Sequence, residues 1–116
     1  MKIAIPLDEN KKKVCVSFAR APFFLFSENG QNEIVVNPAA DAQGGAGIKA
    51  AQFLVDNGTE ILITVRCGQN ANEVFEAAQL AVYKSQTEDA LENLNYFMDG
   101  KLEKLTHFHA GFQGIQ

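Results

Sequence analysis

The segment Glu60–Val65 (Glu-Ile-Leu-Ile-Thr-Val) constrains the fold more than any other part of this chain. It is apolar almost throughout, which is typical of a central strand buried on both faces of a sheet. Before it, apolar residues follow one face of a predicted helix over Ala46–Asn57. After it, Asn70 and Glu73 have the spacing of a capping box, so we expect a second helix over Ala71–Gln79. Such a strand needs helices on both faces of its sheet.

Four further segments have the composition and alternation of strands. They are Lys2–Leu7, Phe23–Ser27, Glu33–Asn37 and Leu80–Lys84. Asn29-Gly30 separates the second of these from the third and predicts a hairpin turn. A last helix is predicted between an N-cap at Thr87 and a stop at Gly100. Its inward-facing residues are predicted to be Leu91, Leu94 and Met98.

The predicted order is three strands followed by alternating helices and strands. This order favours an α/β fold in three layers, with a mixed, mainly parallel five-stranded sheet and helices on both faces. Ligands of such sheets bind beyond the carboxyl ends of the strands. Three predicted loops can reach that edge, and they are Asp8–Pro22, Pro38–Gly47 and Arg66–Asn70.

Composition narrows the class of protein. A chain of 116 residues is expected to form one domain, and the stretch from Lys101 onward looks mostly unstructured. The formal net charge is −4 and the only basic run is Lys11–Lys13, which disfavours a nucleic-acid partner. No apolar run approaches the roughly 20 residues of a membrane span. Two cysteines are too few for a disulfide framework, so we expect a soluble, cytoplasmic protein without a membrane partner.

Cys67 follows the predicted central strand and precedes the second helix. The N–H groups and dipole of a helix N-terminus are expected to stabilise its thiolate, and Arg66 would add positive charge. A thiolate attacks electrophiles or binds metal. The alternative is that Cys67 is a small buried residue at the end of a strand.

Three other residues are candidate metal ligands. Cys15 lies in the first long loop, and two thiolates at the strand edge could share a metal ion or cluster. His107 and His109 fall on one side of an extended chain and could supply two nitrogen ligands. The alternatives are a half-buried Cys15 without a chemical role and two histidines in a solvated end of the chain. No C-x-x-C spacing requires a metal here.

The stretch Gly44-Gly45-Ala46-Gly47 opens the first predicted helix. Gly45, Gly47 and Ala50 match G-x-G-x-x-A, but the motif does not directly follow a strand and the next strand lacks a terminal acid, which excludes NAD binding. A flexible turn and an anion-binding helix N-terminus remain as interpretations. No Ser–His–Asp set or carboxylate pair stands out, so we expect no enzymatic activity. A thiol enzyme using Cys67 is the least favoured hypothesis.

Five motifs occur in a fixed order along the chain. They are Met1–Pro6 (MKIAIP), Phe18–Phe24 (FARAPFF), Asn37–Ala40 (NPAA), Gly44–Ala51 (GGAGIKAA) and Gly68–Ala71 (GQNA). Together they resemble the dinitrogenase iron–molybdenum cofactor biosynthesis family, which includes NifX-type proteins and the C-terminal domain of NifB-type proteins. The resemblance implies a domain over residues 1–105 and leaves a flexible tail over 106–116. It also implies a ribonuclease H-like fold and a non-catalytic accessory role in binding or carrying an iron–sulfur or iron–molybdenum cofactor or its precursor.

Two positions depart from the pattern of the family. Where the family usually has a His-Phe-Gly-Arg stretch, this chain has Ser17-Phe18-Ala19-Arg20, so Ser17 replaces the histidine. Where members often carry Gly-His-Ile-Gly-Pro-Asn, this chain has Val65–Asn70 (VRCGQN). Either cluster binding has been lost, or ligation has moved to the cysteines and the histidines near the end of the chain.

Two hypotheses follow for the carboxyl edge of the sheet. In the first, the protein carries a cluster and meets a cluster donor or acceptor protein. Cys67 and Cys15 would be ligands, Arg20 and Arg66 would neutralise cluster charge, and the helix start would donate N–H groups at Gly45 and Gly47. In the second, the same edge is a metal-free module that binds a small anion or another protein.

Overall fold

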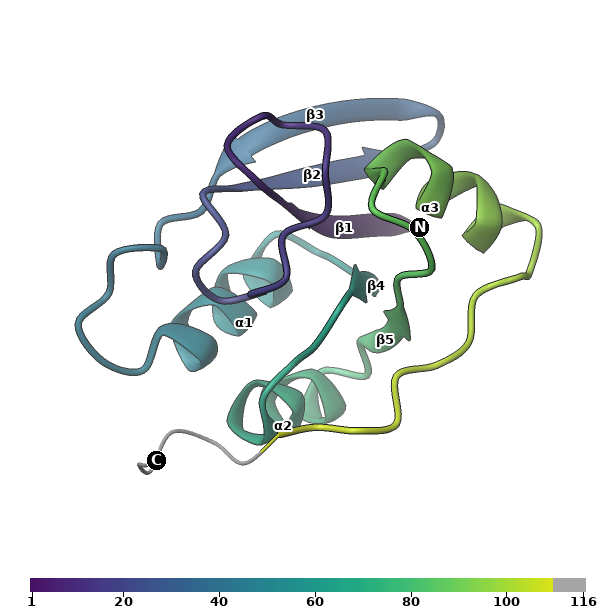
Figure 1. Ribbon diagram of the computed structural model, residues 1–116. Helices are drawn as coiled ribbons and strands as arrows, with labels where there is room; N and C mark the ends of the chain where they lie inside the picture. Colours follow the sequence, from purple (N-terminus) through teal and green to yellow (C-terminus); the bar gives the residue numbers. More distant parts are fainter. Residues whose placement is uncertain (110–116) are drawn as a thin grey trace.

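The structure is a computed structural model, and it describes residues 1–109 of the chain. Within these residues, five strands and three helices follow the predicted order (Figure 1). Their bounds are β1 Lys2–Leu7, β2 Phe23–Glu28, β3 Gln31–Val36, α1 Ala46–Asp56, β4 Ile61–Thr64, α2 Gln69–Ala77, β5 Ala81–Lys84 and α3 Ala90–Met98.

The strands form one mixed sheet in the order β3-β2-β1-β4-β5. β1 pairs with β4 and β4 pairs with β5 in parallel, whereas β2 is antiparallel to both of its neighbours. Only β2 therefore runs against the other strands. The α/β class and the mixed sheet predicted from the sequence are confirmed. The predicted hairpin is also confirmed, because Asn29 and Gly30 both have positive φ, at 54° and 80°.

Side chains from the sheet enter two cores, one on each face. On one face, Ala4, Phe24 and Leu62 pack with Leu54 of α1 and Phe75 of α2. On the other face, alternate residues of the same strands pack with α3; they are Ile3, Ile5, Leu25, Ile61 and Ile63. All residues of β4 are buried, as expected of a strand covered on both faces. The prediction of helices on both faces is confirmed.

The predicted inward face of α3 is partly wrong. Leu94 is buried, but Leu91 is 54% exposed and Met98 is 68% exposed. The N-cap is Asp89, whose side chain accepts from the Glu92 N–H, and not Thr87. The buried face of the helix is set by Asn93, which is fully buried and hydrogen-bonded to the backbone of residues 86, 87 and 89. This anchoring turns Leu91 and Met98 toward solvent.

The start of α2 also differs from prediction. The helix begins at Gln69 with Gly68 as N-cap, and no side chain caps it, so the predicted capping box is wrong. A backbone carbonyl group caps the helix in place of a side chain. The Gln69 N–H donates to the His109 carbonyl oxygen at 2.8 Å. Long-range pairing of this kind leaves no local signal in the sequence.

Residues 101–109 are not unstructured, contrary to the sequence-based expectation. Lys104 forms an antiparallel bridge with Tyr83, and the Leu105 N–H donates to the Val82 carbonyl oxygen at 3.0 Å. This segment therefore lies along the outer edge of β5. Part of the tail predicted over 106–116 lies outside the described residues, and the division at residue 105 stays a prediction. None of the described helices is long and apolar enough to cross a membrane.

Candidate functional site

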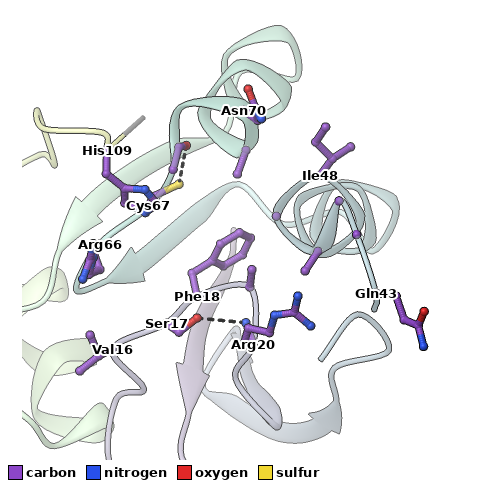
Figure 2. A pocket seen from close by; sticks show the side chains of 17 residues that line it. Val16, Ser17, Phe18, Arg20, Gln43, Ile48, Arg66, Cys67, Asn70 and His109 are labelled. Carbon is purple, nitrogen blue, oxygen red and sulfur yellow. Dashed lines mark hydrogen bonds between the residues drawn. The ribbon is translucent and has the colours of Figure 1, made fainter. Parts of the chain in front are cut away.

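A cavity of about 450 Å³ opens beyond the carboxyl end of β4 (Figure 2). Three loops and the starts of two helices line it. The lining residues are 16–20 after β1, 43–48 at the start of α1, 66–68 and 70–71 at the start of α2, and His109. All three loops that the sequence predicted at this edge line the cavity.

Short contacts hold the first and third of these loops together. Ser17 forms a parallel bridge with Arg66, which joins the two loops. Within the first loop, the Ser17 hydroxyl accepts a hydrogen bond from the Arg20 N–H at 3.2 Å. Below them, the buried ring of Phe18 packs edge-on against Phe75 of α2, with 5.5 Å between ring centroids. Phe18 thus forms an apolar floor between the two arginines (Figure 2).

Arg20 ties the first loop to the second. Its Nη1 donates to the carbonyl oxygens of Ala40, at 3.1 Å, and Ala42, at 2.6 Å. Both bonds come from the same guanidinium nitrogen. They hold the charged group of Arg20 at the rim of the cavity. Arg20 therefore shapes the cavity as well as contributing charge to it.

Two helix N-termini meet at the cavity. α1 begins after Gly45, which adopts a left-handed conformation with φ 66°, and α2 begins after Gly68. Within the described residues, neither helix has a side-chain hydrogen bond at its N-cap. At α2 the Gln69 N–H is bonded to the His109 carbonyl oxygen, so α1 offers the freer N–H groups. Both N-termini carry partial positive charge, which favours an anion.

Charge around the cavity has one sign. Arg20 and Arg66 both line it, and no aspartate or glutamate is among the described residues that do. Over residues 1–109 the only ion pair joins Lys13 to Glu88, so neither arginine is neutralised by a carboxylate. The edge is therefore locally positive in a protein with a net charge of −4.

Comparison with known proteins agrees with the family resemblance. Residues 1–100 match the family model described as dinitrogenase iron–molybdenum cofactor. The chain belongs to this family. A relative in Methanocaldococcus jannaschii, an uncharacterized protein, is 34% identical over 109 residues, which is 90% of this chain and 91% of the relative.

Solved structures of similar proteins share the fold. The apo form of the orange protein from Desulfovibrio gigas superposes with a TM-score of 0.82 at 26% identity, covering 90% of this chain and 92% of that one. A Thermotoga protein named as a NifB candidate superposes with a TM-score of 0.75 at 37% identity, covering 97% and 98%. This member of the cofactor family therefore keeps the common architecture over nearly its whole length.

Cys67 does not behave as its position suggested. Its side chain is buried, 1% exposed, and its Sγ donates to the Gly68 carbonyl oxygen at 3.5 Å. Burial raises the pKa of the Cys67 thiol to about 12. The expectation of a stabilised thiolate is wrong, because loss of hydration outweighs the effect of the helix N-terminus. At neutral pH this family member presents a neutral thiol to the cavity.

The cavity gathers most, but not all, of the predicted site residues. Those that line it are Cys67, Arg20, Arg66, Ser17, Gly45, Gly47 and His109. Cys15 and His107 do not line it. Cys15 is half-buried beside Asp8, and burial together with a hydrogen bond to that carboxylate raises the pKa of its thiol. The structure thus brings Cys67 and His109 to one site and leaves Cys15 outside it.

The described part of this family member has few side chains that could bind a metal. No group of three or more histidine, cysteine, aspartate or glutamate side chains there could hold a metal ion. His109 stands next to the α2 start, and its Cε1 lies 3.0 Å from where a Cβ on Gly68 would be. Among residues 1–109, Cys67 and His109 are the only residues of those types that line the cavity.

Sequence reasoning missed some residues that build the site. Gln43, Ile48 and Asn70 line the cavity, and Asn37 braces its loops from below. The family motifs were the available signal, because Asn37, Ile48 and Asn70 each lie in one of them. An asparagine before a proline is also typical of a turn. Nothing in the sequence singles out Gln43.

Proposed function

We propose that this protein binds an anionic metal–sulfur group as cargo, either an iron–sulfur or iron–molybdenum cofactor or a precursor of one. It acts as an accessory carrier and not as an enzyme, and it exchanges the cargo with a donor or acceptor protein. The observation that carries the proposal is the convergence of two arginines and two helix N-termini on one cavity, where the described residues place no carboxylate and no side-chain cap. Clusters of this kind carry negative charge, so they match that electrostatic environment.

In this proposal, different residues that line the cavity have different roles. Arg20 and Arg66 neutralise the charge of the cargo, and the first turn of α1 after Gly45 donates N–H groups. Cys67 supplies a sulfur atom at the end of β4, and it becomes a ligand only when a metal displaces its proton. Phe18 and Ile48 exclude water from part of the surface of the cargo. Because the cavity offers few side chains that could bind a metal directly, it favours capture of a preassembled cluster over assembly of one from free ions.

A second candidate function is a metal-free module that binds a small anion or a protein at the same edge. The lack of three metal-type ligands within the described residues favours it, as does Ser17 at the position where the family resemblance led us to expect histidine. The two candidates share the electrostatics and differ in whether sulfur and metal take part.

Anaerobic reconstitution with iron and sulfide, followed by absorbance spectra and metal analysis, separates the two. We expect stoichiometric charge-transfer bands in the wild type, weaker retention in Arg66→Gln and loss in Cys67→Ser. Lys101→Gln is the control, because it removes the same charge from an exposed position outside the cavity. Equal retention in Arg66→Gln and Lys101→Gln would contradict an electrostatic role for the cavity.

Titration with molybdate by calorimetry tests the second candidate. Binding of this oxyanion that is weakened by Arg66→Gln, without any reconstituted cluster, would favour the metal-free module. Failure of both experiments would exclude the cluster carrier and the binding of this oxyanion, and would leave a protein as the ligand of the edge.

We also propose the ribonuclease H-like name for the three-layer fold and a cytoplasmic location. The sheet order with β2 alone reversed supports the first. Two free cysteines support the second, since disulfides are rare in reducing compartments. Cell fractionation with an antibody against the protein tests the location.

A further inference from the structure

The two edges of the sheet differ in how they are covered. On the outer side of β5, the Lys84 N–H donates to the Glu103 carbonyl oxygen at 2.8 Å, and Leu105 bonds to Val82. On the outer side of β3, no residue within 1–109 forms a strand pair or a bridge. β3 is therefore the open edge of the described sheet.

The hairpin register fixes which backbone groups of β3 face outward. The two-residue turn at Asn29-Gly30 makes Glu28 and Gln31 a hydrogen-bonded pair, and such pairs recur at every second residue. The Asn37 N–H, which donates to the Pro22 carbonyl oxygen at 3.1 Å, continues the same series. The N–H and C=O groups that point away from β2 are those of Asn32, Ile34 and Val36.

The same edge exposes apolar side chains. Ile34 is 44% exposed and Val36 is 67% exposed. They lie opposite Leu25 and Phe23 of β2, so they extend the α3 face of the sheet beyond the helix that covers it. Edge strands usually carry a lysine, a proline or a bulge that prevents pairing. β3 has none of these, and its single charge is Glu33.

We propose that two copies of this chain pair through β3 in antiparallel orientation, with Ile34 at the two-fold axis. In this register Asn32 faces Val36 of the second copy and Ile34 faces its own counterpart. Three hydrogen-bonded pairs form, which amounts to about six backbone hydrogen bonds. Isologous pairing of this kind closes as a dimer and leaves no further open edge at β3.

Charge selects this register over its neighbour. With Ile34 on the axis, Glu33 lies opposite Val35 of the second copy. A shift that pairs Asn32 with Ile34 would set Glu33 directly against its own counterpart, and like charges in direct cross-strand contact are destabilising. No residue of β3 lines the cavity, so dimerisation leaves both cargo sites open and the inference does not depend on the proposed function.

Disulfide trapping tests the register directly. In a Cys15→Ala background, Ile34→Cys should cross-link to its counterpart under mild oxidation, because hydrogen-bonded antiparallel partners lie about 5.5 Å apart between Cα atoms. Glu33→Cys, one residue away and also exposed, should not cross-link efficiently. Preferential cross-linking of Glu33→Cys, or none in either variant, would overturn the proposed pairing.

Light scattering coupled to size-exclusion chromatography tests the dimer without a cross-link. The wild type and Ile34→Val should show a mass above that of the monomer as the concentration rises to about 1 mM, the weak end of specific association. Ile34→Pro removes an outward N–H without touching the ladder to β2, so it should stay monomeric. A monomeric wild type, or an Ile34→Pro variant that is folded by circular dichroism and still dimeric, would overturn the proposal.

Discussion

The side-chain amide of Asn37 donates a hydrogen bond to the carbonyl oxygen of Ala21 at 2.9 Å, across 16 residues of sequence. The same nitrogen donates to Ala19 at 3.0 Å, and its Oδ1 accepts from the Ala39 N–H at 2.9 Å. Asn37 is itself buried. One side chain thus fastens the loop after β1 to the turn after β3, and these are two of the three loops that build the cavity.

Replacing Asn37 with alanine should lower the free energy of unfolding by about 2–3 kcal/mol, because it leaves buried carbonyl oxygens without donors. Urea denaturation followed by circular dichroism would measure the change. Asn57→Ala is the matched control, since that amide makes one hydrogen bond, to Phe53, at an exposed position. Equal losses in the two variants would contradict the bracing role of Asn37.

Arg20→Lys should loosen the second loop while it keeps the charge. A lysine ammonium cannot reproduce the planar arrangement with which Arg20 reaches Ala40 and Ala42, so we expect a loss of about 1 kcal/mol. Hydrogen exchange of the Ala42 amide, which donates to Ala39, reports on this loop. It should be faster in Arg20→Lys than in the wild type.

Arg20→Gln separates geometry from charge. Arg20→Lys and Arg20→Gln should both make amide exchange in the loop faster. Of the two, only Arg20→Gln should also strongly lower the affinity for an anion such as molybdate. An unchanged Ala42 exchange rate in both variants would show that the loop holds its shape without the guanidinium.

Local patterns predicted most of the fold. The continuous apolar run of β4, the Asn29-Gly30 turn and the stop at Gly100 each report a backbone preference that neighbouring residues decide. The three cavity loops followed from strand order alone, because the carboxyl ends of parallel strands meet at one edge.

The errors at the two helices come from hydrogen bonds that residue patterns do not specify. Gln69 is capped by the distant His109 carbonyl oxygen, and Asn93 orients α3 through its side-chain bonds to residues 86, 87 and 89. Neither partner can be inferred from spacing. The ionisation of Cys67 was misjudged for a related reason, since its burial depends on how loops from three parts of the chain close over it.

The free energy of unfolding should fall as the pH rises through the alkaline range, because of Cys67. Its pKa rises on folding from 9.0 to about 12, so the folded state keeps a proton that the unfolded state releases. The free energy of unfolding contributed by this thiol is present below pH 9 and is lost as pH rises toward 12. The expected slope is about −1.4 kcal/mol per pH unit within that window.

Urea titrations at several pH values between 8 and 10.5 test this dependence, with the slope of the wild type compared with that of Cys67→Ala. Other titrating groups contribute equally to both proteins, so the difference in slope isolates the thiol. Parallel slopes would mean that Cys67 ionises in the folded protein as it does in the unfolded chain.

The last prediction concerns Gly68, where the backbone passes close to an imidazole. A Cβ at this position would lie 3.0 Å from the Cε1 atom of His109, so Gly68→Ala forces the ring or the segment that carries it to move. Because the His109 carbonyl oxygen accepts from the Gln69 N–H, that bond should weaken. We expect a loss of about 1 kcal/mol in the free energy of unfolding, as for mild overpacking. Gln69 amide exchange should become faster.

Gly44→Ala is the matched control for this change. Gly44 also lines the cavity, but a Cβ there meets no atom within 4 Å, and its φ is not in the left-handed region. A methyl group at Gly44 should therefore be neutral or stabilise the protein by about 0.4–1 kcal/mol through the unfolded state. If Gly68→Ala and Gly44→Ala gave the same stability and the same Gln69 exchange rate, the ring would yield without strain. The approach of His109 to Gly68 would then not fix the start of α2.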